Sequence, residues 1–87
     1  SITKIDILKI DVEGLELKVL KSLSSVISEI EITLIKIEIQ FNNKDNLPNV
    51  INYLNKYGYE LSGFSNTKYL KNSIFFVDAY FILVKND

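Results

Sequence analysis

The sequence predicts an α/β fold with the element order β-α-β-α-β-β, and three patterns support this prediction. The first is an Ile- and Leu-rich run at residues 4–12 that gives way to helical spacing. The second is an alternating run at residues 33–41, again followed by a helical pattern. The third is a pair of C-terminal apolar runs with no helix between them. Together these patterns predict parallel pairing of the early strands and an antiparallel hairpin at the end.

The first strand and the first helix meet at Gly14. Residues 4–12 show little alternation, which is typical of a strand that is covered on both faces. From Gly14 onward, apolar residues recur every three or four positions and Lys and Ser fall on the opposite side, which predicts one amphipathic helix. Glu13 and Glu16 lie in its first turn, where negative charge interacts favourably with the helix dipole. Its apolar positions are Leu15, Val19, Leu23, Val26, Ile27 and Ile30.

The second strand and the second helix follow the same scheme. Residues 33–41 place Ile on one side and polar residues on the other, which predicts a half-buried strand. Residues 47–57 predict a helix with Pro48 near its first turn and Gly58 as a left-handed stop. We expect its inner face to consist of Leu47, Val50, Ile51, Leu54 and Tyr57.

The C-terminal part predicts two strands. Residues 59–64 form a short strand candidate, residues 65–73 are polar and turn-like, and residues 74–85 form the last strand. The five Tyr and five Phe of the chain mostly fall at positions compatible with a core, which favours packing over a stacking surface.

The composition limits the chemistry that the chain can perform. Its 87 residues are 47% hydrophobic and 24% charged, which fits one folded domain. Ten basic residues, all of them Lys, nearly balance eleven acidic ones, so we expect neither a nucleic-acid nor a membrane partner. Without His or Cys, acid–base or metal chemistry must come from Asp, Glu, Lys, Tyr or backbone groups. No apolar run approaches the ~20 residues that span a bilayer and no signal peptide is visible, so we expect a cytoplasmic protein.

Two acids end the first predicted strand. Asp11 and Glu13 are two positions apart, so their side chains would point the same way if the strand continued that far. Such a pair can hold a divalent cation or take a proton from a substrate hydroxyl. The alternative is structural: Asp11 caps the next helix and Glu13 interacts with the helix dipole. Local residue types alone favour this structural alternative.

A third acid, Glu38, lies near the end of the second predicted strand. If the two strands are adjacent and parallel, Glu38 lies at the same edge of the sheet as Asp11, where ligands of open α/β sheets bind. The alternative is an ion pair of Glu38 with Lys36 or Lys9 on a half-solvated face. No phosphate-binding loop accompanies these acids, because the three glycines are isolated and form neither a GxGxxG nor a Walker motif.

The segment IDILKIDVEGLELKVLKSL, residues 5–23, resembles the signature of the FkbM family of S-adenosylmethionine-dependent methyltransferases. The family pattern is an apolar stretch, KIDVEG, a small residue, Glu, and an apolar helix that ends near KG. Leu15 stands where Ala is usual and Ser22 where Gly is usual. Downstream, IKIEIQF, LPNVINYLNKYGYEL and DAYFILVK resemble the next strand, the following helix and the terminal strand of the family.

The resemblance implies that residues 1–87 are the C-terminal part of one Rossmann-like methyltransferase domain. The four strands would be the fourth to the seventh of its sheet, in the order 4-5-7-6, with the last strand antiparallel. The strands that carry the glycine-rich cofactor loop would lie outside the chain, so the S-adenosylmethionine site would be incomplete and the isolated piece inactive. The first strand would then expose an Ile-rich edge, through which the chain would self-associate or pair with the missing half.

The resemblance also implies roles for the three acids. Asp11 matches the acid beside the methyl group of the cofactor, Glu13 the next acid of the motif, and Glu38 the acid of the fifth strand. We therefore expect Asp11 and Glu13 to be catalytic in methyl transfer to a hydroxyl of a small acceptor, a sugar or a natural product. If a divalent cation is bound, Asp11 and Glu38 are its expected ligands.

Two other interpretations stay open. The spacing Asp-Val-Glu is similar to the metal-binding D-x-D of nucleotide-sugar glycosyltransferases, which predicts a piece of such an enzyme. Alternatively, the chain is a non-catalytic α/β interaction module in which the acids are structural.

Overall fold

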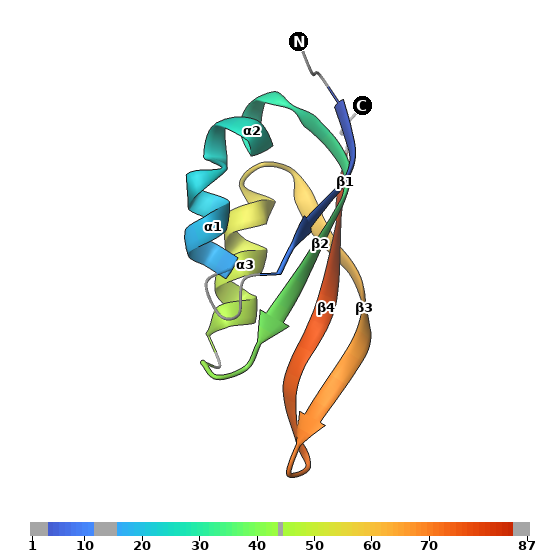
Figure 1. The fold of residues 1–87 in the computed structure, drawn as a ribbon. Coiled ribbons are helices and arrows are strands. Elements are labelled where there is room, and N and C mark those ends of the chain that lie inside the picture. The colour runs from blue at the N-terminus through green and yellow to red at the C-terminus, as the bar shows by residue number, and fades with distance from the viewer. Residues whose placement is uncertain (1–3, 12–15, 44, 85–87) are drawn as a thin grey trace.

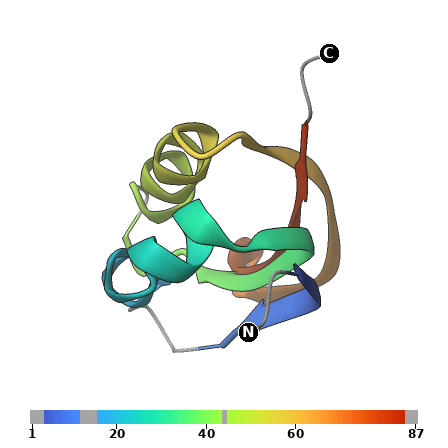
Figure 2. The same ribbon diagram turned by 90° about the horizontal axis from the view of Figure 1, so that it is seen from above.

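The computed structural model describes residues 4–11, 16–43 and 45–84, which form a mixed four-stranded sheet with three helices on one of its faces (Figure 1). Seen from above, the helices gather on one side and the sheet curves past them (Figure 2). The α/β class predicted from the sequence is confirmed. The elements are β1 (Lys4–Ile10), α1 (Glu16–Ser22), α2 (Ser24–Glu29), β2 (Glu31–Gln40), α3 (Asn46–Asn55), β3 (Tyr59–Leu70) and β4 (Ser73–Leu83).

The strands lie in the order β1-β2-β4-β3. β1 is parallel to β2, with Ile10 opposite Ile37, whereas β4 is antiparallel to both of its neighbours. In the β2–β4 pair, Glu38 lies opposite Asp78. The parallel pair has its carboxyl ends at a single edge of the sheet, and α1 and α3 begin at that edge (Figure 1).

The core lies between the sheet and the helices. In β2, Ile35, Ile37 and Ile39 are fully buried, whereas the residues between them are half-buried, as the alternating sequence predicts. The helices add apolar side chains that are almost completely buried, and β4 adds three more. These side chains are Leu20, Ile27, Val50, Leu54, Val77, Ala79 and Phe81.

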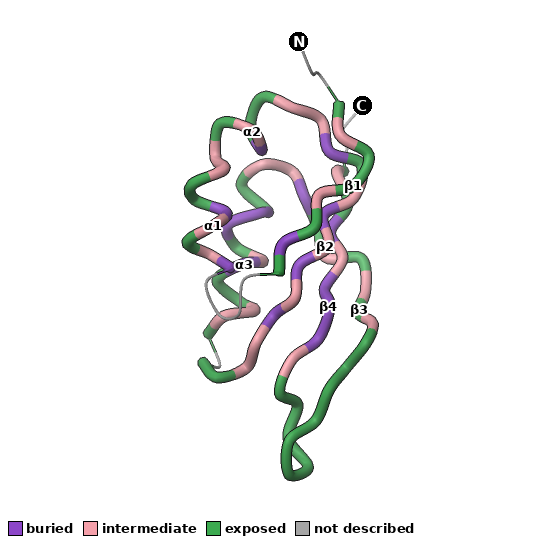
Figure 3. The backbone as a smooth tube through the Cα atoms, in the orientation of Figure 1, coloured by how far each residue is buried: buried purple, intermediate pink, exposed green. Residues whose placement is uncertain are grey.

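The hairpin of β3 and β4 extends beyond the rest of the sheet and gives the molecule its elongated dimensions of 45 × 24 × 19 Å. Its far half is exposed (Figure 3). The turn consists of Lys71 and Asn72, whose φ values of 51° and 68° are those of a type I′ turn, the type that matches the twist of two-residue hairpins. A bulge in β3 holds Asn66 at a φ of 53°, where the pairing register with β4 shifts.

Two predictions about the strands were wrong. Residues 65–70 continue β3 as a strand and are not a loop, because the left-handed turn is supplied by Lys71 and Asn72 without a glycine. β1 is not covered on both faces either, since Ile7 is 53% exposed and only Ile10 is buried. The helices of the described part cover one face of the sheet and leave the other open.

The single helix predicted after Gly14 is two helices, because the chain breaks at Leu23. There the φ and ψ values are −99° and 15°, and the backbone N–H is shared between the carbonyls of Val19 and Leu20. The hydroxyl of Ser22 also donates to the Val19 carbonyl at 2.7 Å. Serine side chains compete in this way for helical carbonyls, which weakens the helix at the Ser-rich segment.

The second predicted helix is confirmed as α3, although it ends two residues earlier than expected, at Asn55. Gly58 has a φ of +88°, the left-handed conformation that the sequence predicted for it. Val50 and Leu54 face the core as expected, and Tyr53, which the predicted inner face omitted, is buried with them. None of the described helices is long and apolar enough to cross a bilayer.

Candidate functional site at the carboxyl edge of the parallel strands

Asp11 and Glu38 lie at the edge where β1 and β2 end. Ile10 pairs with Ile37, so one more residue along each strand brings Asp11 level with Glu38. Asp11 is exposed and Glu38 is half-buried. The structure thus brings these two predicted site residues to one edge of the sheet, whereas Glu13 lies outside the residues that it describes.

Glu16 closes the gap that β1 leaves when it ends before β2. The backbone N–H of Phe41 donates to Phe75 on β4, so the polar groups of the preceding Gln40 face the other way, toward the side of β1. There the N–H of Gln40 donates to Glu16 Oε1 at 3.2 Å, and its carbonyl accepts from Asn46 Nδ2 at 2.8 Å. Glu16 is 1% exposed. Two side chains therefore satisfy backbone groups that have lost their strand partner, and they fix the starts of α1 and α3 against the end of β2.

The open face of the sheet carries an open-face cluster of Lys36, Asn66 and Asp78. Asp78 is only 8% exposed; its Oδ2 accepts from Asn66 Nδ2 at 2.7 Å and lies 3.6 Å from Lys36 Nζ. Glu38 occupies the opposite position on β2 and points to the same face, because its neighbours Ile37 and Ile39 point into the core. Lys36 and Asn66 thus offset the repulsion that two facing carboxylates would otherwise produce.

The expected divalent cation finds no support in this geometry. Over the described ranges, no three side chains of Asp, Glu, His or Cys come together in a group that could hold a metal ion. Asp11 and Glu38 are two oxygen-bearing side chains, and hard cations take six or more oxygen ligands in total.

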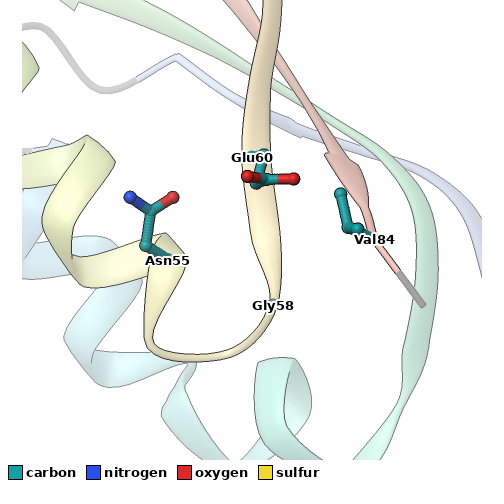
Figure 4. A pocket seen from close by; sticks show the side chains of 4 residues that line it. All are labelled: Asn55, Gly58, Glu60 and Val84. Atoms are coloured by element: carbon teal, nitrogen blue, oxygen red, sulfur yellow. The ribbon is translucent and has the colours of Figure 1, made fainter. Parts of the chain in front are cut away.

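A separate hollow lies at the opposite end of the sheet (Figure 4). Its volume is about 300 Å³, and it is lined by Asn55, Gly58, Glu60 and Val84. The N–H of Val84 donates to the Gly58 carbonyl at 2.8 Å and ties the end of β4 to the turn after α3. This hollow lies away from Asp11, at the end where α3 finishes, and its residues show no arrangement typical of catalysis.

One ionisable side chain in the core has a strongly altered pKa. Burial, together with the neighbouring Tyr57, raises the pKa of Tyr53 from 10.0 to about 12. The Tyr53 hydroxyl donates to the Leu20 carbonyl at 3.3 Å, and the two tyrosine rings lie 5.4 Å apart. Tyr53 therefore joins α3 to α1 and is remote from the carboxyl edge.

Sequence reasoning missed the positions of two acids. Glu16 was interpreted as a dipole-compensating residue, but it is a buried hydrogen-bond acceptor. Asp78 was included in the last strand without a role. The signal for it was a lone acid inside the apolar run IFFVDAYFILV, which predicts a side chain with polar partners.

The topology and the acidic edge define a class of protein. A mixed sheet whose parallel pair ends in acids, with helices beginning at the same edge, is compatible with part of a Rossmann-like enzyme. A comparison with protein families then gives the family: residues 1–61 match the methyltransferase FkbM domain. Since the match covers more than half of the 87 residues, the chain belongs to the FkbM methyltransferase family.

The resemblance on which this family was expected is thereby confirmed. Searches of curated proteins and of solved structures found no match. The family match does not favour the glycosyltransferase interpretation or the non-catalytic one.

Proposed function

We propose that this chain is part of an S-adenosylmethionine-dependent methyltransferase that methylates a hydroxyl group of a small molecule. The observation that carries the proposal is the family match over residues 1–61, which includes the segment that ends at Asp11 on the carboxyl edge. Ligands of open α/β sheets bind at this edge.

Asp11 is the residue that we assign to the acceptor. It is exposed and therefore accessible to an acceptor hydroxyl, from which its carboxylate would take the proton when that hydroxyl is methylated. Glu38 is level with Asp11 on the next strand, and we assign it a supporting role in orienting the acceptor hydroxyl. Glu13, the next acid of the motif, is proposed as a second catalytic residue on the family pattern alone. Catalysis would depend mainly on holding the two reactants in line.

The residues present do not fit a complete cofactor site. S-Adenosylmethionine, which methyltransferases use in general, supplies an electrophilic methyl group. A cradle for it needs a glycine-rich turn after a strand, and the glycines of this chain are isolated. We therefore assign no cofactor contact to these residues, and we do not include a divalent cation, because the part of the chain that the structure describes brings no three metal-binding side chains together.

We further propose that the cofactor-binding strands come from residues outside the 87 and pair with the free side of β1. In this proposal β1, β2, β3 and β4 are the fourth to the seventh strands of the complete sheet, in the order 4-5-7-6. The observed order β1-β2-β4-β3 is compatible with it. In the described part, β1 bonds to β2 alone, and an unpaired strand edge seeks a partner. A second copy of the chain is the alternative partner for this edge.

The test measures transfer of labelled methyl groups from S-adenosylmethionine to hydroxylated acceptors. It uses the 87-residue chain and a longer polypeptide that adds the residues encoded upstream of Ser1. We expect transfer by the longer polypeptide, reduced about 100-fold or more by Asp11→Asn, which removes the proton acceptor. Asp6→Asn, an exposed acid on the same strand, is the matched control and should leave the rate unchanged.

Two results would contradict parts of this proposal. Equal rates for wild type and Asp11→Asn would remove Asp11 from the chemistry. A clear rise in the melting temperature of the 87-residue chain with S-adenosylmethionine would show that its cofactor site is complete, against our assignment.

A further inference from the structure

The end of the β3–β4 hairpin, residues 68–75, projects past the carboxyl edge of the parallel strands, and we call it the hairpin tip (Figure 1). Gln40, the last residue of β2, pairs with Phe76, so residues 73–75 of β4 lie past the end of β2, beside the last residues of β3. At about 3.3 Å per residue, the step from Phe76 to Ser73 alone carries the tip roughly 10 Å beyond β2. Every residue of the tip is exposed (Figure 3).

The tip is fixed to the sheet at its base. Asn66 Nδ2 donates to Oδ2 of the buried Asp78 at 2.7 Å, and the N–H of Phe41 donates to the Phe75 carbonyl at 2.8 Å. The first contact joins β3 to β4, and the second joins the end of β2 to β4. The tip therefore keeps one direction relative to the carboxyl edge.

Both faces of the tip carry large apolar side chains that are exposed. Tyr69 and Leu70 are successive residues of β3, and Ile74 and Phe75 are successive residues of β4. Successive side chains of a strand point to opposite faces, so each face of this two-stranded ribbon presents apolar groups. A flat protein partner would cover one face and leave the other in water. A medium that surrounds the tip would cover both.

The tip is also the basic part of the chain. No residue between Glu60 and Asp78 is acidic, whereas two of the ten Lys, Lys68 and Lys71, lie there and are exposed. The other eight Lys stand against all eleven acids, so the remainder of the chain is acidic. The balanced net charge, from which we expected no membrane partner, thus conceals a separation of charge. Lysines beside an anionic membrane surface are attracted to it over about one Debye length.

We propose that the hairpin tip binds the surface of an anionic lipid bilayer. Leu70, Ile74 and Phe75 enter the boundary between headgroups and acyl chains, which interfacial segments penetrate by about 5–10 Å, a depth that the projection of the tip matches. Tyr69 places its amphipathic ring at the level of the headgroups, and the two lysines of the tip extend their charged ends to the anionic lipids. Binding in this orientation turns the carboxyl edge of the sheet toward the membrane. The inference does not depend on the proposed function.

The experiment is flotation of the 87-residue chain with lipid vesicles on a sucrose gradient, in which bound protein rises and aggregated protein does not. One set of vesicles contains phosphatidylcholine alone, and the other also contains about 30% phosphatidylserine. We expect binding to the anionic vesicles to be about tenfold tighter or more. It should weaken as NaCl rises from about 0.1 M to about 0.5 M, because salt screens the attraction of the lysines.

A matched pair of isoleucines on β4 locates the apolar contact. Ile74→Ser removes a side chain of the tip that is 46% exposed, and it should weaken binding to the anionic vesicles about tenfold. Ile82→Ser removes a side chain that is 43% exposed but lies outside the tip, and it should leave the affinity unchanged.

A matched pair of double substitutions locates the charge contact. Lys68→Gln combined with Lys71→Gln should remove most of the preference for anionic vesicles, because both charges of the tip are lost. Lys18→Gln combined with Lys21→Gln removes two exposed lysines of α1 and lowers the net charge equally, yet it should preserve this preference.

Three flotation results would overturn the inference: no binding to anionic vesicles, equal binding to both kinds of vesicle, or equal weakening by Ile74→Ser and Ile82→Ser. Sedimentation velocity without vesicles tests a second copy of the chain as the partner. A dimer that Ile74→Ser dissociates and Ile82→Ser leaves intact would make the tip an interface between copies and would also overturn it.

The longer polypeptide that adds the residues encoded upstream of Ser1 gives the last comparison. If the 87-residue chain floats and the longer polypeptide does not, the added residues cover the tip and the inference is wrong. Flotation needs neither cofactor nor acceptor, so failure of methyl transfer would refute the proposed function and leave the membrane result unchanged.

Discussion

The two faces of the sheet are built from alternate residues of the same strands, yet they differ in composition and in burial. On the face toward the helices, Ile35, Ile37 and Ile39 of β2 are fully buried. On the open face the residues between them are polar, and Glu38 lies opposite Asp78 of β4. One step along the chain thus separates a dry apolar layer from a row of charged side chains.

The difference between the two faces indicates that the residues that stabilise the fold and the residues of the candidate site lie on different sides of the sheet. Burial of apolar area provides most of the free energy of folding, and in this chain that area lies on the helix side. The acids that we propose to act on a substrate, Asp11 and Glu38, lie at the edge or on the open face. We therefore expect substitutions on the helix side to unfold the protein and substitutions on the other side to change its activity.

The largest expected effect is a contrast between two isoleucines. Ile37→Ala opens a cavity in the centre of the core and should lower the free energy of unfolding by about 3–4 kcal/mol. Ile82→Ala, on β4 at a side chain that is 43% exposed, should cost less than about 1 kcal/mol. Urea denaturation followed by circular dichroism measures both. Similar losses for the two variants would refute the division between the faces.

A smaller effect distinguishes the buried acids of the two sides. Glu16→Ala leaves the N–H of Gln40 without its acceptor and should cost about 2 kcal/mol, and Glu16→Gln, which keeps an acceptor oxygen, should recover part of the loss. Asp78→Ala should cost only about 1 kcal/mol, because it also removes the repulsion with Glu38 and lets Lys36 return to water. The same denaturation experiment compares the three variants, and a larger loss for Asp78→Ala than for Glu16→Ala would reverse our ranking.

The pattern of apolar residues was sufficient to predict the α/β class, the alternation of β2 and the left-handed stop at Gly58. The pattern did not predict two features that depend on individual hydrogen bonds or backbone angles. The break at Leu23 depends on serine hydroxyls that compete for carbonyls, and the long hairpin depends on Lys71 and Asn72 adopting positive φ without a glycine. Neither feature changes the hydrophobic period, so periodicity alone does not detect it.

Outside the core, too, some features could be predicted from the sequence and others could not. Asp11 and Glu38 could be placed on one edge because parallel pairing follows from the β-α-β order, and the register agrees with that expectation. An apolar cleft between the hairpin and the start of α3 could not be predicted, since its aromatic residues Phe41 and Phe64 look like core positions in the sequence. Phe41 follows β2, Phe64 lies on β3 and the cleft residue Leu47 lies on α3, so the cleft depends on how separate segments pack together.

The smallest expected effect concerns Tyr53 on the helix side. Its pKa is raised to about 12 in the folded chain, compared with 10.0 for an ordinary tyrosine. Above pH 10 the unfolded chain loses this proton while the folded chain keeps it, so stability falls as the pH rises toward 12. Between about pH 9 and about pH 11, wild type should lose about 1 kcal/mol more than Tyr53→Phe, which has no hydroxyl to titrate.

Urea denaturation at the two pH values measures this difference. Tyr69→Phe removes a hydroxyl from a side chain that is 66% exposed and should keep the pH dependence of wild type. If wild type and Tyr53→Phe lose stability in parallel, the Tyr53 hydroxyl titrates normally and is accessible to water. Water would then reach the contact between the Tyr53 hydroxyl and the Leu20 carbonyl, and the helix side would be less dry than this contact indicates.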